Sequence, residues 1–157
     1  MKHFIFSVLL LGLLLCSFGC NKNPHGVTMV TGIVTLDDQP LDQATVIFHP
    51  PEGNQAASGR TDAEGKFAVT TGSSEAGTGA QPGHYQVAIA KMGLSPEGER
   101  LEAEAMRTGR VFNSVNYTIS LIPKIYGNPA TSGFEATVEK GKKNHFIFKL
   151  EGSAPNQ

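Results

Sequence analysis

The chain has no tryptophan, only two cysteines and a formal net charge of −1 at pH 7. Nucleic-acid binding needs a basic stripe that displaces counterions from phosphates, so this charge balance predicts no nucleic-acid partner. Both cysteines, Cys16 and Cys20, lie near the start of the chain, and the rest holds no thiol pair that could form a disulfide. Stability therefore has to come from the burial of apolar side chains, and the length suits one domain.

Long apolar runs are also missing. The longest, residues 4–15, is shorter than the roughly 20 residues that a helix needs to cross a bilayer. Lys2 precedes this run, and Gly19 and Cys20 close it before polar residues begin, which is the pattern of a secretory signal. A cysteine directly after a small residue at this point is where a bacterial lipoprotein is acylated and cut. The sequence therefore predicts a signal peptide over residues 1–19 and lipidation of Cys20.

The predicted lipidation site departs from the usual lipobox at one position. Ser17 stands three residues before Cys20, where that motif usually has leucine. Cleavage by the ordinary signal peptidase and retention as an uncleaved anchor are the two alternatives. Two or more acyl chains hold a protein stably on a bilayer. We therefore expect a location in the cell envelope, with a lipid anchor in the membrane, a tether over residues 20–26, and a domain that faces the periplasm or the exterior.

From Val27 onward the chain consists of short β-rich runs with turn residues between them, and helical periodicity is mostly absent. This predicts an all-β fold, an antiparallel β-sandwich of seven to eight strands over residues 27–151, followed by a disordered tail over 152–157. Alternation within the runs predicts that Phe48, Phe67, Tyr85 and Phe148 face the core. The predicted strands are residues 27–36, 44–49, 57–61, 66–71, 84–90, 117–122, 134–139 and 143–150.

Three connections have clear sequence signatures. Residues 62–65 predict a hairpin turn in which Gly65 takes positive φ, and the glycine-rich residues 71–83 predict a mobile loop. Ser95 is a helix cap, Pro96 fits a first turn, and Gly109 can end a helix, so residues 96–107 predict one short helix. Its apolar positions form only a thin stripe, which indicates an exposed and poorly anchored helix.

Several of these segments together resemble a known family. Residues 30–36 (VTGIVTL), 39–41 (QPL), 44–48 (ATVIF), 59–67 (GRTDAEGKF) and 82–87 (PGHYQV) are similar to the carboxypeptidase regulatory-like repeat, with its T-D-x-x-G hairpin and P-G-x-Y-x-V strand. Residues 122–126 (IPKIY) and 131–134 (TSGF) resemble a block in small lipoproteins of planctomycete-type bacteria. The resemblance implies a transthyretin-like (Ig-like) sandwich and no activity, because the family's domains are mostly accessory.

Candidate catalytic and metal sites are weak throughout the sequence. Asp62 and Glu64 are too few oxygen ligands for a calcium loop, and the G-x-S-x-G motif of a nucleophilic serine is absent. A transthyretin-like hydrolase would also end in Tyr-Arg-Gly-Ser, which this chain does not. The sequence therefore predicts no enzyme, no metal and no cofactor. The five histidines lack metal-ligand spacing. His3 lies in the signal and His25 in the tether, and His49, His84 and His145 are expected on strand surfaces.

Two functions remain open from the sequence. The first is a membrane-anchored envelope lipoprotein whose sandwich is a non-catalytic interaction or structural module, with envelope proteins as partners. The alternative is a module that binds carbohydrate or another small ligand of the envelope, with glycans stacked on Tyr85, Tyr117 or Tyr126. The other interpretation of these three tyrosines is that they fill the edge of the core.

Overall fold

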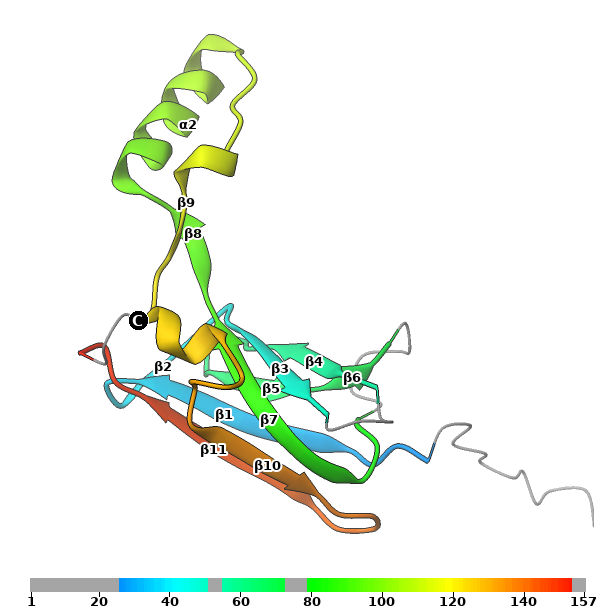
Figure 1. Cartoon of the computed structure of the whole chain (residues 1–157). Coiled ribbons are helices and arrows are strands. Elements are labelled where there is room, and N and C mark those ends of the chain that lie inside the picture. The colour runs from blue at the N-terminus through cyan, green and yellow to red at the C-terminus, as the bar shows by residue number, and fades with distance from the viewer. Residues whose placement is uncertain (1–25, 51–54, 73–78, 154–157) are drawn as a thin grey trace, which may run out of the picture.

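The computed structural model describes residues 26–50, 55–72 and 79–153. They form an all-β sandwich, as predicted, with one helix on an arm that projects from it (Figure 1). The predicted signal peptide, Cys20, nearly all of the tether and most of the predicted tail lie outside the described residues. Residues 73–78 of the predicted mobile loop do so too.

The first sheet is built around β1 (Val30–Leu36). On one side β1 pairs along its whole length with β11 (Asn144–Leu150), from Val30 opposite Asn144 to Leu36 opposite Leu150. This pairing is parallel, whereas every other strand pair in the described residues is antiparallel. On its other side β1 pairs with β5 (Lys66–Ala68) and with β2 (Gln39–Pro40).

The second sheet has the order β10-β7-β3-β4-β6. Its longest strand, β7, carries the predicted apolar face, and Tyr85, Val87 and Ile89 are all fully buried. The bounds are β3 (Thr45–His49), β4 (Ala57–Arg60), β6 (Thr70–Thr71), β7 (Gly83–Ala90) and β10 (Phe134–Val138).

Phe48 lies at the centre of the core between the two sheets. Its fully buried ring lies 5.8 to 6.3 Å, centroid to centroid, from four other aromatic rings. These distances suit the tilted and edge-to-face geometries that aromatic pairs prefer. The neighbouring rings come from both sheets, which fixes how the two layers pack. They are Phe67, Tyr85, Phe146 and Phe148.

The predicted strand over residues 66–71 is divided between the two sheets. β5 pairs with β1 in the first sheet, whereas β6 pairs with β4 in the second, and the crossing occurs at the buried Val69. The turn before it forms as predicted, with Gly65 at φ +72°. It is not a hairpin between paired strands, however, because β4 and β5 belong to different sheets. At the crossing the backbones come close together, since a Cβ on Gly59 would lie 2.3 Å from the Ala68 carbonyl oxygen.

The arm, residues 91–121, follows directly from the end of β7. It contains β8 (Met92–Leu94), the helix α2 (Pro96–Thr108), the short 3₁₀ helix η2 (Val115–Tyr117) and β9 (Thr118–Ser120). The prediction of a sandwich strand over residues 117–122 is wrong, because within the described residues β9 pairs with β8 alone and with no strand of the sandwich. A second 3₁₀ helix, η3 (Lys124–Gly127), returns the chain to β10.

The arm and the N-terminal end of the domain lie at opposite ends of the sandwich (Figure 1). Thr28 forms a β-bridge with Ala80, just before β7 begins, whereas the arm leaves where β7 ends. A tether attached before Gly26 would therefore leave the domain at the end far from the arm.

Candidate interaction site

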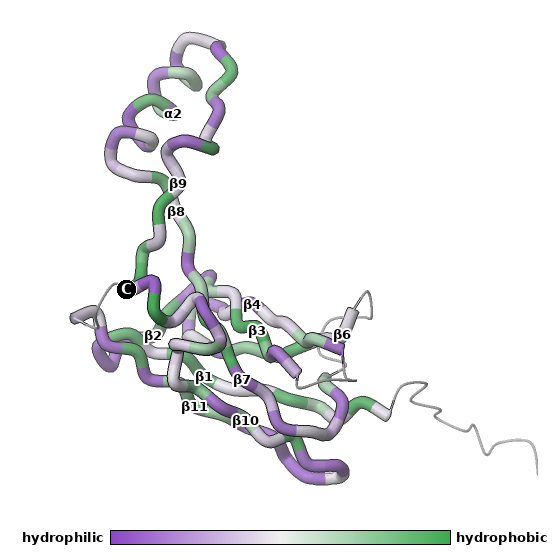
Figure 2. The backbone as a smooth tube through the Cα atoms, viewed as in Figure 1, coloured by the Kyte–Doolittle hydropathy of each residue, from purple (hydrophilic) through white to green (hydrophobic). Residues whose placement is uncertain are grey.

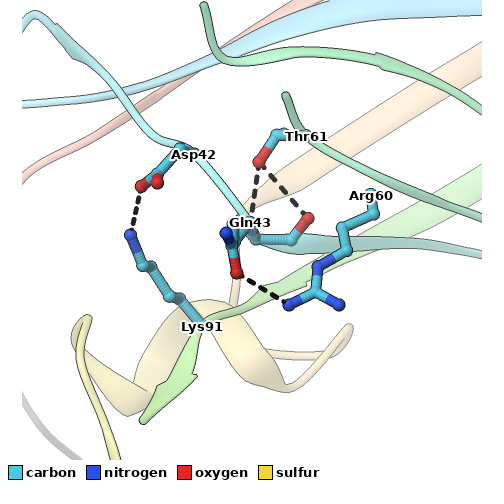
Figure 3. A network of polar contacts seen from close by, with 6 residues as sticks. Asp42, Gln43, Arg60, Thr61 and Lys91 are labelled. Atoms are coloured by element: carbon cyan, nitrogen blue, oxygen red, sulfur yellow. Dashed lines mark hydrogen bonds and ion pairs between the residues drawn. The ribbon is translucent and has the colours of Figure 1, made fainter. Parts of the chain in front are cut away.

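Lys91 makes two contacts at the base of the arm. Its ammonium group donates to the Asp42 carboxylate at 2.5 Å (Figure 3). Its carbonyl oxygen accepts from the Leu121 amide at 2.8 Å. The hydrogen bond from Lys91, together with its charge, lowers the pKa of Asp42. Because Lys91 begins the arm and Leu121 ends it, the two chain segments of the arm are joined where they meet the sandwich.

Next to this ion pair, a second set of polar contacts holds the loop that carries Asp42. The Thr61 hydroxyl accepts from the Ala44 amide at 2.8 Å, and the Arg60 guanidinium donates to the Gln43 side chain at 3.2 Å (Figure 3). Thr61 is buried, so its hydroxyl would be costly to leave unpaired. The loop that carries Asp42 is thus held against the end of β4 by hydrogen bonds.

Above the base, the arm narrows to a ribbon of two strands. β8 and β9 share three residue pairs. The Leu121 side chain packs closely against Gly93, because a Cβ on Gly93 would lie 2.6 Å from it. A two-stranded ribbon is only marginally stable alone in water. The ribbon therefore depends on what packs against it.

The helix α2 forms the outer part of the arm and has the caps that its sequence predicts. The Ser95 hydroxyl accepts from the Gly98 amide at 3.2 Å, and Gly109 ends the helix at φ 69°. Only Gly98 and Ala105 of the helix are buried, which agrees with the predicted weak anchoring. Gly98 packs so closely against Tyr117 that a Cβ would lie 2.7 Å from the Tyr117 side chain.

The charges on α2 are arranged along its axis. Four glutamates occupy its first nine residues, and Arg107 lies in its last turn, which suits the helix dipole. Arg100 donates to Glu97 at 2.7 Å and also lies 3.9 Å from Glu104, and the hydrogen bond to Arg100 lowers the pKa of Glu97. Beyond Glu104 no acidic residue occurs until Glu135. The far end of the arm is therefore basic and its near end acidic.

The arm concentrates exposed apolar side chains. Among the described residues eight large hydrophobic side chains are exposed, and six of them belong to the arm. Figure 2 shows apolar stretches between polar ones along the whole arm, on α2, on the return segment after it and on the two strands β8 and β9. Val111, near the tip, is 100% exposed. Contiguous exposed apolar surface is common at interaction sites, so the arm is the candidate interaction surface of the described residues. The six are Met92, Met106, Val111, Val115, Ile119 and Leu121.

A hollow of about 370 Å³ lies between α2 and the return segment. The Phe112 and Tyr117 rings, 5.6 Å apart, form its aromatic part. Glu104, Arg110 and Asn116 add polar groups that can donate and accept hydrogen bonds. An aromatic ring beside several hydrogen-bonding side chains has the chemistry to hold a small polar ligand such as a sugar.

The structure separates the three tyrosines that the sequence grouped as stacking rings. Tyr85 is fully buried and donates to the Gln81 carbonyl at 2.8 Å. Tyr126 is also buried, with its ring stacked on Phe134 and its hydroxyl accepting from the Glu151 amide at 2.9 Å. Neither ring offers a free face, so both belong to the core. Tyr117 alone of the three lines the hollow.

The other polar side chains weighed in the sequence have local roles. The Asp62 carboxylate accepts from the amides of Glu64 and Lys66 at 3.0 and 2.8 Å and so caps its own turn. His84 and His145 are on strands, beside Thr137 and Thr31. The part of the chain that the structure describes contains no group of three or more histidine, cysteine or acidic residues placed to hold a metal ion. It also contains no helix with the length and apolar character needed to span a membrane.

The fold and this site define an all-β sandwich with a projecting, apolar-rich arm. Comparisons with protein-family models, with curated proteins and with solved structures found no match to the chain. The sequence had predicted the helix of the arm but missed the arm itself. A signal was present in the isolated apolar residues Met106, Val111 and Val115, which fit neither a strand alternation nor a helix stripe.

Proposed function

We propose that this protein is a membrane-anchored lipoprotein of the cell envelope and that its β-sandwich is a non-catalytic interaction module. The observation that carries the proposal is the gathering of exposed apolar side chains on the arm, because a surface of this kind is normally covered by a partner. The sandwich supplies a rigid body, and the Lys91–Asp42 ion pair holds the arm on it.

The anchor follows from the sequence around Cys20. An acylated Cys20 would hold the chain at the end of the sandwich that lies opposite to the arm, so the arm would point away from the anchored end. The resemblance to carboxypeptidase regulatory-like domains supports the same function, since such domains mostly serve as accessory modules.

Two substitutions test the two halves of the proposal in the full chain. Cys20→Ala removes the acylated thiol and is expected to move the protein from the membrane fraction to the soluble fraction. Val111→Glu places a charge in the apolar surface of the arm and is expected to abolish the capture of envelope partners after chemical cross-linking. Ile147→Glu is the matched control, because Ile147 is an exposed apolar residue on β11. Equal partner capture by both glutamate variants would contradict the proposed use of the arm.

The hollow on the arm favours a second candidate function, the binding of envelope carbohydrate. A sugar ring would stack on Tyr117 and hydrogen-bond to Asn116 and Glu104. Tyr117→Ala is expected to abolish binding on a glycan array. Tyr126→Phe is the control, since the Tyr126 ring is buried in the sandwich. A blank array with the unaltered protein would exclude this function.

A further inference from the structure

The outward face of α2 carries a stripe of three exposed residues, Glu99, Ala103 and Arg107. Residues four apart in a helix lie on the same face, one turn above the other. The buried residues of α2, Gly98 and Ala105, face the return segment of the arm, which leaves this stripe on the opposite side. The exposed side of α2 therefore carries an acidic, a small and a basic residue at equal spacing along the helix.

The charges at the two ends of the stripe have no ion-pair partner in the described residues, in contrast to Arg100 on the same helix. They also cannot pair with each other, because eight residues correspond to about 12 Å along a helix. The stripe is self-complementary, however. If the helix of a second copy is turned antiparallel to the first, its Arg107 faces Glu99 of the first copy and its Glu99 faces Arg107. The Ala103 side chains of the two copies then meet in the middle.

We propose that α2 packs against α2 of a second copy of this chain, antiparallel, about a twofold axis that passes beside Ala103. Glu99 then forms an ion pair with the partner's Arg107, and the symmetry generates the same pair a second time. Alanine at the crossing point allows the two helices to approach to about 8 Å, the close limit of helix packing. The proposal deepens the proposed function, on which it rests, by naming the partner of the arm.

The apolar residues of the arm fit the same arrangement. In an antiparallel pair the tip of one arm lies beside the base of the other. Met106 and Val111, near the tip, are then placed next to the ribbon that carries the partner's Met92. Each contact occurs twice, as in any interface with twofold symmetry. A short ribbon and a single helix with little buried surface would gain from the second copy the packing that they lack alone.

The position of the arm allows this pairing. The arm leaves one end of the sandwich, so two arms can lie side by side while each sandwich extends beyond a different end of the pair (Figure 1). The acidic near end of each arm then lies beside the basic far end of the other. A parallel arrangement would instead bring like charges together along the whole helix.

A cysteine at the twofold axis tests the proposal directly. In the full chain expressed in intact cells, Ala103→Cys is expected to give a disulfide-linked dimer under mild oxidation, since facing Cα atoms of closely packed helices fall within the 4.4 to 6.8 Å span of a disulfide. The controls are the unaltered chain and Ala63→Cys, since Ala63 is an exposed alanine in the turn before β5. Neither control should show a covalent dimer on a denaturing, non-reducing gel. An Ala103→Cys chain that does not cross-link more than the Ala63→Cys chain would overturn the proposal.

Charge exchange tests the register of the pair. In detergent solution, Arg107→Glu or Glu99→Arg alone is expected to raise the dimer dissociation constant at least about tenfold, because each turns two attractive pairs into two repulsive ones. The chain that carries both substitutions should return to within about threefold of the unaltered value. A double variant that is weaker than either single variant would overturn the proposal.

These results separate the proposal from the function on which it rests. A monomeric protein that still captures a different envelope protein through Val111 would overturn self-pairing and leave the interaction function standing. A monomeric protein whose capture of partners does not change in Val111→Glu would overturn both.

Discussion

The Lys91 ammonium group, at the first residue of the arm, donates to the carboxylate of Asp42 in the loop between β2 and β3. Because the Lys91 carbonyl also accepts from the last residue of the arm, Leu121, this one residue links both ends of the arm to the sandwich. This ion pair is thus one of the contacts that set the direction in which the arm projects, and it lies beside a marginal ribbon.

Asp42→Asn is expected to loosen the arm without unfolding the sandwich. The amide side chain loses the charge that holds Lys91, so the backbone order parameters of residues 91–121 measured by NMR relaxation should fall, while those of β1 and β7 stay unchanged. The matched control is Asp38→Asn, which removes the more exposed ion pair with Lys149 and should leave the arm as it is. Equal mobility of the arm in both variants would show that the ion pair does not hold it.

Acid should loosen the arm in the same way. The pKa of Asp42 is lowered in the folded protein by its hydrogen bond from Lys91, so the ion pair stabilises the fold above the unfolded pKa of about 3.9. That contribution is lost as the pH falls from about 4 through the folded pKa. Order parameters of the arm should therefore stay constant down to about pH 4 and decrease between there and the acid limit of folding. In Asp42→Asn the arm should be loose throughout, and a parallel acid response in that variant would contradict this assignment.

Phe48→Ala should destabilise the sandwich severely. It removes a fully buried ring in contact with four others, and losses of about 3 to 5 kcal/mol in the free energy of unfolding are typical of such cavities. Ile147→Ala, on the exposed side of β11, should change it by less than about 0.5 kcal/mol. Urea denaturation of both variants gives the comparison, and similar losses would mean that the core is centred elsewhere.

Gly32→Ala should also destabilise, for a different reason. A Cβ at Gly32 would lie 2.3 Å from the Phe146 carbonyl oxygen and 2.5 Å from the Phe67 ring, so the parallel pair β1 and β11 would have to separate. Overpacking of this kind costs about 1 to 3 kcal/mol. Gly127→Ala meets no atom within 4 Å and should be nearly neutral when unfolding is followed by urea. A neutral Gly32→Ala variant would contradict the close approach of these strands.

Much of the fold could be predicted from local sequence. Alternation identified the buried faces of β3, β7 and β11, and the capping residues Ser95 and Gly109 fixed the helix within one residue of its observed end. These features depend on neighbours along the chain, which a sequence displays directly.

The features that were missed depend on contacts between distant segments. The run over residues 66–71 is continuous in sequence, and only its pairing with β1 and with β4 shows that it changes sheets at Val69. The strand β9 has ordinary β-forming residues, and nothing local indicates that it pairs with β8 outside the sandwich. The candidate site was missed for the same reason, since Tyr117 and Phe112 come together beside α2 only because the chain returns along that helix.

The mass of the mature protein is the most direct test of the central claim that a lipid anchor holds this sandwich and its arm in the cell envelope. Intact-mass and N-terminal peptide spectra of protein extracted from membranes should show a chain that begins at Cys20 and carries acyl groups on that residue. A chain that retains Met1, or one that begins elsewhere with an unmodified Cys20, would contradict the claim.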